Sequence, residues 1–122
     1  MTDDAARPGL TACSLCAGES LGPGEGPRAE QLARLEQLAA DGVARLTLVE
    51  CLDECERGDV VVARPTGACR RAGVAPVWFQ QLAGDGLTGE LRGWLEAGGP
   101  GAAAMPGALE PHRFRHDEPL PD

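Results

Sequence analysis

Two pairs of closely spaced cysteines constrain this chain more than any other feature of its sequence. Cys13 and Cys16 have two residues between them, and Cys51 and Cys55 have three. Each pair can supply two thiolates from one short turn, and a tetrahedral centre built on sulfur ligands needs four. A fold that uses all four thiolates must bring the two pairs together, although a predicted helix and strand separate them in the sequence.

Length and charge narrow the classes of fold and partner. The 122 residues suffice for one domain, and an aromatic content of 3% leaves Leu, Val and Ala to build the core. The formal net charge of −8 argues against nucleic acid or an anionic membrane as a partner, because both would repel the chain. The charge is compatible with docking onto a basic protein surface.

The cysteines are expected to be reduced. Residues 1–4 lack an apolar stretch, so no signal peptide is expected. No apolar run approaches the ~20 residues of a membrane-spanning helix. These features predict a cytoplasmic protein, in which structural disulfides are rare. The five cysteines then indicate metal binding or thiol redox chemistry.

The segment 27–41 is predicted to form a helix. Pro27 suits the first helical turn, and Gly42 is placed to end the helix. Glu30 and Arg34 have the spacing of an ion pair on the outer side of this helix. The apolar side chains fall on one face, which consists of Leu32, Leu35, Leu38 and Ala39.

Apolar runs predict four strands, which lie at 10–12, 43–50, 60–63 and 74–79. The last two runs are close enough in the sequence to pair as a hairpin. Asp85 is placed to cap a second helix. That helix carries apolar residues at helical spacing, namely Leu87, Leu91, Trp94 and Leu95.

The order of these elements is strand, helix, strand, strand, strand, helix, and it predicts the fold class. The class is α/β, a small thioredoxin-like fold with a mixed four-stranded sheet and two main helices. The domain is expected to span 8–97, and the Gly- and Pro-rich segment 98–122 is expected to be a flexible, disordered tail. If the first two strands are parallel neighbours joined by the 27–41 helix, both cysteine pairs emerge at the same end of the sheet.

Three chemistries compete for the thiolates. A 2Fe–2S cluster takes four cysteines around two irons and tolerates unequal spacing within the pairs. A single zinc, cobalt or similar ion could use the same thiolates in a metal-binding or metal-delivery protein. A thiol–disulfide oxidoreductase would need only Cys13 and Cys16. However, a Gly- and Pro-rich loop stands where a helix would be needed to lower the thiol pKa.

The stretch 49–62, VECLDECERGDVVV, resembles the second cysteine pair and following strand of thioredoxin-like 2Fe–2S ferredoxins. The short first pair, Gly26-Pro27-Arg28 and Val77-Trp78-Phe79 are closer to a bacterial family of predicted metal-binding proteins, which is similar to these ferredoxins. The resemblance covers roughly residues 10–97. Ferredoxins of this fold separate the first two cysteines by a longer loop than the two residues found here. The resemblance implies that the cluster ligands are Cys13, Cys16, Cys51 and Cys55.

The resemblance also implies a function. Such a protein passes single electrons between a reductase and a partner enzyme, and related ferredoxins often form homodimers. The sequence has no P-loop lysine and no Gly-x-Gly-x-x-Gly motif after a strand. The protein itself is therefore not expected to be an enzyme.

Acidic residues crowd the second cysteine pair. They could form a solvated loop, or an acidic rim that steers a basic redox partner toward the centre. The same negative charge would lower the reduction potential of a cluster. The residues assigned to this docking role are Asp53, Glu54, Glu56 and Asp59.

Three further residues could bind metal or react as thiols. Cys69 lies in a predicted loop, and a cysteine without a role is a simpler interpretation than a spare ligand. His112 and His116 are four apart, but Pro111 and the lack of apolar periodicity argue against a helix that would bring them together. The basic and aromatic stretch 112–116 could dock a partner or fold back on the acidic rim, although a tail without a role is simpler.

Overall fold

The computed structural model of the chain describes residues 7–14, 18, 28–50 and 58–115. Its strands are β1 (Gly9–Cys13), β2 (Arg45–Val49), β3 (Val61–Arg64), β4 (Val77–Phe79) and β5 (Arg113–Phe114). Its helices are α1 (Arg28–Ala40), α2 (Gly67–Arg71), α3 (Asp85–Glu96) and the 3-10 helix η3 (Gly107–His112). None of the helices in this part of the chain is long and apolar enough to cross a membrane.

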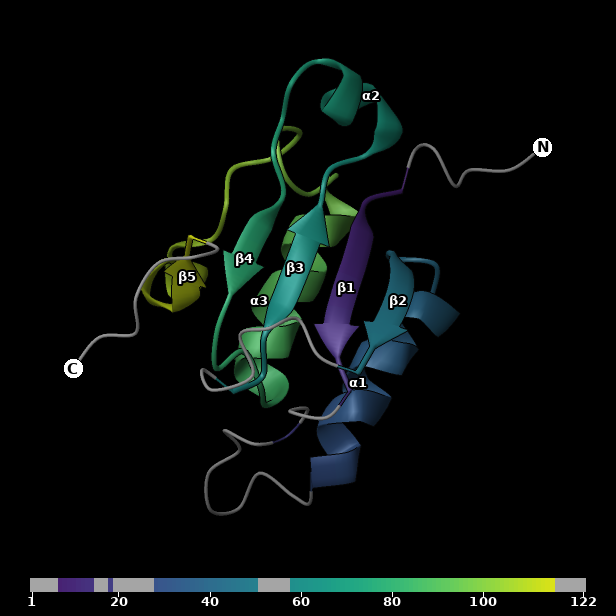
Figure 1. Cartoon of the computed structure of the whole chain (residues 1–122), viewed down its shortest axis with the longest axis vertical. Helices are drawn as coiled ribbons and strands as arrows, with labels where there is room; N and C mark the ends of the chain where they lie inside the picture. Colours follow the sequence, from purple (N-terminus) through teal and green to yellow (C-terminus); the bar gives the residue numbers. More distant parts are fainter. Residues whose placement is uncertain (1–6, 15–17, 19–27, 51–57, 116–122) are drawn as a thin grey trace.

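One mixed sheet of five strands, in the order β2-β1-β3-β4-β5, forms the centre of the protein (Figure 1). β1 and β2 are parallel, and the other neighbouring strands are antiparallel. β3 and β4 form the predicted hairpin, with Val62 opposite Trp78. The structure therefore confirms an α/β fold with a mixed sheet and two main helices, α1 and α3.

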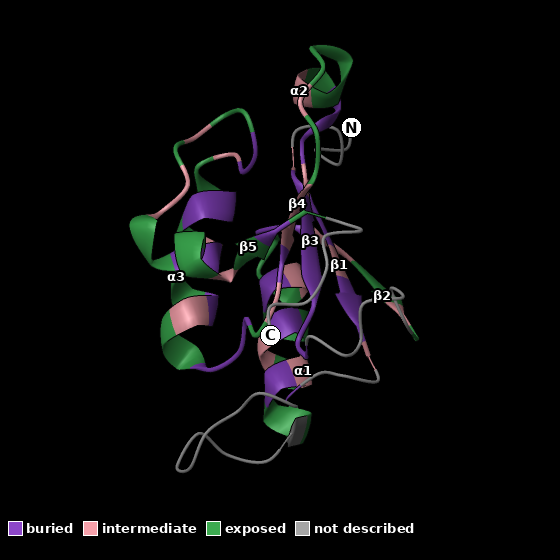
Figure 2. Cartoon of the chain, turned by 60° about the vertical axis from the view of Figure 1, so that its left-hand side comes forward, coloured by how far each residue is buried: buried purple, intermediate pink, exposed green. Residues whose placement is uncertain are grey.

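Both main helices pack on one face of the sheet and share a single core with it (Figure 2). Strand residues of alternating positions point into this core, because successive side chains of a strand face opposite sides. Phe79 of β4 and Trp94 of α3 meet edge to face, with ring centroids 6.0 Å apart. The largest apolar side chains buried there are Leu10, Leu35, Phe79, Leu82, Leu91, Leu95 and Leu109.

α1 is stabilised by its apolar face and by a glycine at its end. Leu35 and Leu38 are 2% and 3% exposed, as the periodicity predicts. Gly42 has a φ of 75°, and its N–H bonds to the carbonyl of Ala39 at 3.0 Å. The N–H of Val43 bonds to the carbonyl of Leu38 at 2.9 Å. This pair of bonds is a Schellman motif, which ends the helix and turns the chain into β2.

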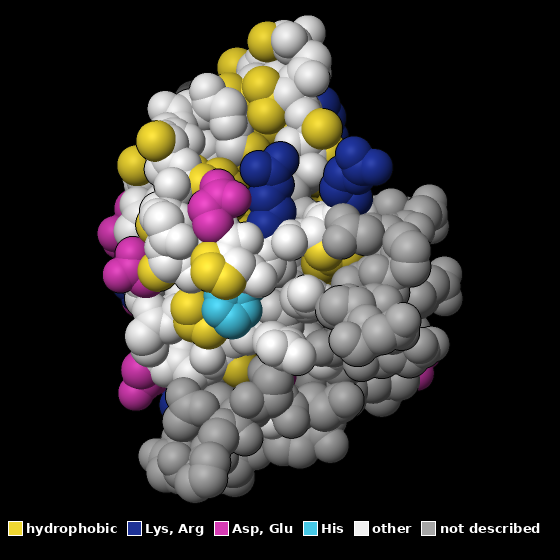
Figure 3. Space-filling model, turned by 90° about the vertical axis from the view of Figure 1, so that its left-hand side faces the viewer, with side chains coloured by type: hydrophobic (Ala, Val, Ile, Leu, Met, Phe, Trp, Pro, Cys, Tyr) yellow, Lys and Arg dark blue, Asp and Glu magenta, His cyan; other side chains and the backbone are white. Residues whose placement is uncertain are grey.

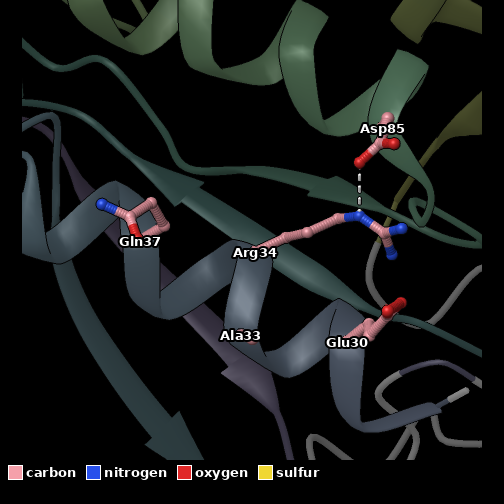
Figure 4. A pocket seen from close by; sticks show the side chains of 5 residues that line it. All are labelled: Glu30, Ala33, Arg34, Gln37 and Asp85. Carbon is pink, nitrogen blue, oxygen red and sulfur yellow. Dashed lines mark hydrogen bonds and ion pairs between the residues drawn. The ribbon is translucent and has the colours of Figure 1, made fainter. Parts of the chain in front are cut away.

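The start of α3 differs from the prediction by one residue. Asp85 is the first helical residue, and Gly84 occupies the capping position with a φ of 93°. Glycine adopts this backbone conformation readily, whereas an aspartate would be strained in it. The N–H of Gly84 donates to Oε1 of Gln31 at 2.9 Å. Arg34, expected to pair with Glu30, binds Asp85 with 2.7 Å between Nε and Oδ1 (Figure 4).

The segment 98–115 is part of the fold, which corrects the prediction of a flexible tail for this stretch. It adds η3 and β5, and β5 pairs with β4 as a fifth strand where four were predicted. Leu109 is fully buried, and Phe114 is 4% exposed. The indole N–H of Trp94 donates to the carbonyl of Ala103 at 3.0 Å. Isolated apolar residues among glycines and prolines give no periodic signal, so the sequence did not predict this packing.

Leu109→Ala is expected to destabilise the protein by about 2–5 kcal/mol, because it leaves a cavity in the core. Ala108 is exposed on the same 3-10 helix, and the control Ala108→Ser should change stability little. Chemical denaturation followed by tryptophan fluorescence measures both variants. Equal stability of the two would contradict a structural role for 98–115.

Candidate metal centre

β1 and β2 end side by side, and each leads into a segment that carries cysteines. In the parallel register Cys13 lies opposite Val49, the last residue of β2. The N–H of Ser14 donates to the carbonyl of Val49 at 2.7 Å, so the pairing continues to the end of both strands. Both strands end at the lower end of the sheet in Figure 1. The strands that precede the two cysteine pairs are thus parallel neighbours, which is the condition under which both pairs are expected at the same end of the sheet.

The thiol of Cys13 contacts the start of the second cysteine-bearing segment. Cys13 is 1% exposed, and its Sγ donates a hydrogen bond of 3.1 Å to the carbonyl oxygen of Glu50. Glu50 immediately precedes Cys51 in the sequence. A thiol of the first pair therefore touches the residue next to the second pair. Cys16, Cys51 and Cys55 lie outside the described residues.

Apolar side chains surround Cys13 on the face of the sheet opposite to the helices. Val60 and Phe114 are buried with it, and Trp78 packs against the same cluster. The rings of Trp78 and Phe114 meet edge to face with centroids 6.0 Å apart. The preceding residue, Ala12, belongs to the core under the helices, which is the alternation expected of a strand. Phe114 comes from the segment predicted to be a tail, so sequence reasoning missed it.

Asp59 connects the two cysteine-bearing segments. It is 3% exposed, and its Oδ1 accepts a hydrogen bond of 2.6 Å from the backbone N–H of Gly18. Gly18 follows Cys16 by two residues, and Asp59 follows Cys55 by four. A carboxylate that accepts from a backbone N–H makes a strong, charge-assisted contact. This contact links the backbone that follows Cys16 to the side chain of a residue that follows Cys55.

The backbone around Asp59 is held in an uncommon conformation. Asp59 has a φ of 46°, in the left-handed region that few residues other than glycine adopt. The carbonyl of Asp59 accepts from the N–H of Leu82 at 3.3 Å, and that of Gly58 accepts from the N–H of Gln81 at 2.7 Å. The link between β4 and α3 therefore braces this end of the second segment.

The burial of Asp59 changes the predicted docking surface. The sequence groups Asp59 with an exposed acidic rim, but its carboxylate bonds to Gly18 in the interior. Asp53, Glu54 and Glu56 lie outside the described residues, and the rim that they would form stays a prediction. Nothing in the sequence around Asp59 signals a partner 41 residues away, so this contact could not have been inferred from spacing.

Cys69 lies in α2, at the opposite end of the sheet from Cys13 (Figure 1). α2 follows β3, whose last residue, Arg64, stands opposite Gly9 at the start of β1. The thiol of Cys69 is free and half-buried, and its backbone N–H bonds to Oγ1 of the capping Thr66 at 3.3 Å. Cys69 is therefore not placed beside Cys13 as a further ligand.

His112 is half-buried at the end of η3. Its ring Nδ1 lies 3.1 Å from the carbonyl oxygen of Gln80. Figure 3 shows one face of the molecule, on which hydrophobic, basic, acidic and histidine side chains are exposed. His116 lies outside the described residues. Within the part of the chain that the structure describes, no three His, Cys, Asp or Glu side chains group into a metal site.

An open hollow of about 410 Å³ lies between α1 and α3 (Figure 4). The ion pair of Arg34 and Asp85 crosses it. Its lining contains no thiol or imidazole group and consists of Glu30, Ala33, Arg34, Gln37 and Asp85. This hollow therefore offers no ligands to a sulfur-preferring metal.

Comparisons with known proteins give no match. No family model matches the sequence, and neither a curated protein nor a solved structure matches the chain. The resemblance to thioredoxin-like ferredoxins therefore gains no support from these comparisons, and the function rests on the geometry of the chain itself.

Asp59→Ala is expected to destabilise the protein by about 1–3 kcal/mol, because it leaves the buried N–H of Gly18 without an acceptor. Asp59→Asn should cost less, since asparagine keeps an oxygen acceptor and tolerates a positive φ. Denaturant unfolding measures both, and hydrogen exchange at the Gly18 amide reports the contact directly. Slow exchange at Gly18 in Asp59→Ala would contradict the role assigned to the carboxylate.

Proposed function

We propose that the protein is a small electron-transfer protein that holds a 2Fe–2S cluster with Cys13, Cys16, Cys51 and Cys55. The observation that carries this proposal is the 3.1 Å contact between the Cys13 thiol and the carbonyl of Glu50. The contact links two cysteine-bearing segments at the ends of parallel strands. Two thiolates from each segment make up the donor set that such a cluster requires.

The surroundings of Cys13 fit a thiolate ligand. Its Sγ donates a hydrogen bond as a thiol, and binding of a metal would release that proton. Val60, Trp78 and Phe114 exclude water from one side of the sulfur. Asp59 holds the two segments together from their far ends. A cluster bound there would supply one-electron transfer.

The strand order supports a thioredoxin-like domain as the scaffold. The strands run in the order β2-β1-β3-β4, with the first pair parallel and the others antiparallel. One main helix follows β1 and the other follows β4. A small thioredoxin-like domain has this arrangement, and β5 would be an addition at its edge.

A single zinc or cobalt ion held by the same four cysteines is the second candidate. The contact between Cys13 and Glu50 also suits a tetrahedral four-thiolate site, because such a site needs the same convergence of two pairs. The protein would then bind or deliver a metal ion and would contain no sulfide.

Thiol–disulfide exchange by Cys13 and Cys16 is less well supported. An attacking thiolate must be accessible to the disulfide that it reduces. Cys13 is 1% exposed, and its thiol is hydrogen-bonded to Glu50. Its burial suits a ligand better than a nucleophile.

A redox partner with a basic docking surface completes the proposal. The net charge of −8 favours such a partner, and Asp53, Glu54 and Glu56 remain the residues proposed to face it. Asp59 is left out of this surface because its carboxylate is buried. Steering by exposed charges would make the association rate fall as the salt concentration rises.

Protein purified without oxygen is expected to be red-brown and to contain iron and acid-labile sulfide in equal amounts. Elemental analysis, sulfide determination and a visible spectrum measure this. Colourless protein that is fully loaded with zinc and lacks sulfide would replace the cluster by the second candidate. Protein that binds neither metal nor cluster would contradict both.

Single serine variants of the cysteines test the ligand set. Each substitution is expected to abolish the colour and the bound iron when it removes a ligand, and the four variants are Cys13→Ser, Cys16→Ser, Cys51→Ser and Cys55→Ser. The matched control is Cys69→Ser, which should keep both because Cys69 lies at the other end of the sheet. Full colour in a variant of the first group would exclude that cysteine as a ligand. Disulfide reduction by colourless Cys51→Ser protein would favour the oxidoreductase.

A further inference from the structure

Two arginines flank a glycine at the end of the sheet that lies away from Cys13. Gly9 opens β1, and the register places it between Arg45 of β2 and Arg64 of β3. Directly opposed residues of neighbouring strands share one face of a sheet. Both arginines therefore extend from the face that carries Cys13, near the upper end of the sheet in Figure 1.

The guanidinium group of Arg64 lies over the backbone of Gly9. Its Nη2 donates to Oγ1 of Thr47 at 3.2 Å and to the carbonyl of Arg45 at 3.4 Å. A Cβ atom on Gly9 would stand 2.7 Å from Cζ of Arg64. The absence of a side chain at Gly9 therefore makes room for the charged group.

No carboxylate balances these arginines among the residues that the structure describes. The Nε atoms of Arg45 and Arg64 are buried, and neither has a hydrogen-bond acceptor in the described part of the chain. Arg92, by contrast, pairs with Asp41 at 2.7 Å. The chain carries 19 acidic and 11 basic residues, so carboxylates are abundant elsewhere. Within the described residues, Arg45 and Arg64 therefore have no carboxylate partner.

A third arginine adds to the positive charge. Arg70 lies in the last turn of α2, the helix that follows β3. Burial lowers the pKa of Arg64, and the nearby charges of Arg45 and Arg70 lower it further. Arginine nevertheless stays charged at physiological pH. The like charges repel one another, and an anion bound between them would offset that repulsion.

We propose that Arg45, Arg64 and Arg70, which we name the arginine cluster, form a binding site for a phosphate-type oxyanion. Guanidinium groups bind such anions through paired N–H donors, with a geometry that carboxylates and phosphates match. Free phosphate and the phosphoryl group of a larger molecule share this chemistry. The site does not depend on the metal centre, because the two lie at opposite ends of β1.

Calorimetric titration of the full chain with inorganic phosphate at low ionic strength tests the proposal. Saturable binding of one phosphate per chain is expected. Arg64→Gln should weaken binding by about tenfold or more, since it removes charge-assisted donors. Gly9→Ala should also weaken it without removing a charge, because the new methyl group displaces the guanidinium. The matched control, Arg92→Gln, removes the same charge elsewhere and should keep the wild-type affinity.

Several outcomes would overturn the proposal. The proposal is wrong if phosphate shows no saturable binding. It is also wrong if an acidic peptide binds more tightly than phosphate. Equal loss in Arg64→Gln and Arg92→Gln would mean attraction by net charge alone. Wild-type affinity in Arg64→Gln would mean an adventitious ion only.

Glycerol 3-phosphate distinguishes free phosphate from the phosphoryl group of a larger molecule as the ligand. Tighter binding of glycerol 3-phosphate than of inorganic phosphate indicates a phosphorylated molecule.

A second variant keeps the test valid if Arg64→Gln fails to fold. Arg64→Lys keeps the charge but lacks the planar pair of donors, and it should bind phosphate more weakly than the wild type. Circular dichroism establishes that each variant is folded before its affinity is compared. Wild-type affinity in folded Arg64→Lys would contradict recognition by the guanidinium group.

Discussion

The parallel pairing of β1 and β2 is the constraint on which the candidate metal centre depends. Parallel neighbours need a crossover connection, and α1 supplies it. Leu35 and Leu38 bury one face of that helix, and Gly42 ends it at the point where β2 can begin beside β1. The strand ends then meet, and the thiol of Cys13 reaches the carbonyl of Glu50. Residues far apart in the sequence become neighbours through this one pairing.

The sequence predicts those parts of the fold that have a local signal. Apolar periodicity indicates α1 and the strands, and the glycine after α1 marks its end. The signal fails where one glycine conformation decides a boundary, as at Gly84 before Asp85. It fails again for Leu109 and Phe114, which are single apolar residues in a Gly- and Pro-rich stretch. Their burial depends on the long-range packing of 98–115 against α3 and β4, which no short window of sequence contains.

The candidate site likewise has features that the sequence predicts and features that only the structure shows. The sequence places the two cysteine pairs at one end of the sheet if the strands before them are parallel neighbours, and the structure shows that these strands are parallel and that Cys13 ends one of them. Asp59 shows the limit of such reasoning, because its charge suggests exposure while its partner Gly18 holds it inside. The sequence did not predict the arginine cluster either. Arg45 and Arg64 lie on strands on either side of β1, and only the strand order shows that both flank Gly9.

The arginine cluster and the candidate metal centre lie at the two ends of β1, and the distance between them limits the electrostatic interaction between the sites. Gly9 and Cys13 are the ends of β1, and four strand steps correspond to about 13 Å. Over that distance a single negative charge contributes about 0.3 kcal/mol in water and about 1.3 kcal/mol at an effective dielectric constant of 20. An anion bound by the arginine cluster would therefore lower the reduction potential of a 2Fe–2S centre held at Cys13 by about 10–55 mV. The arginines alone act in the opposite direction, so anion binding would tune electron transfer without switching it off.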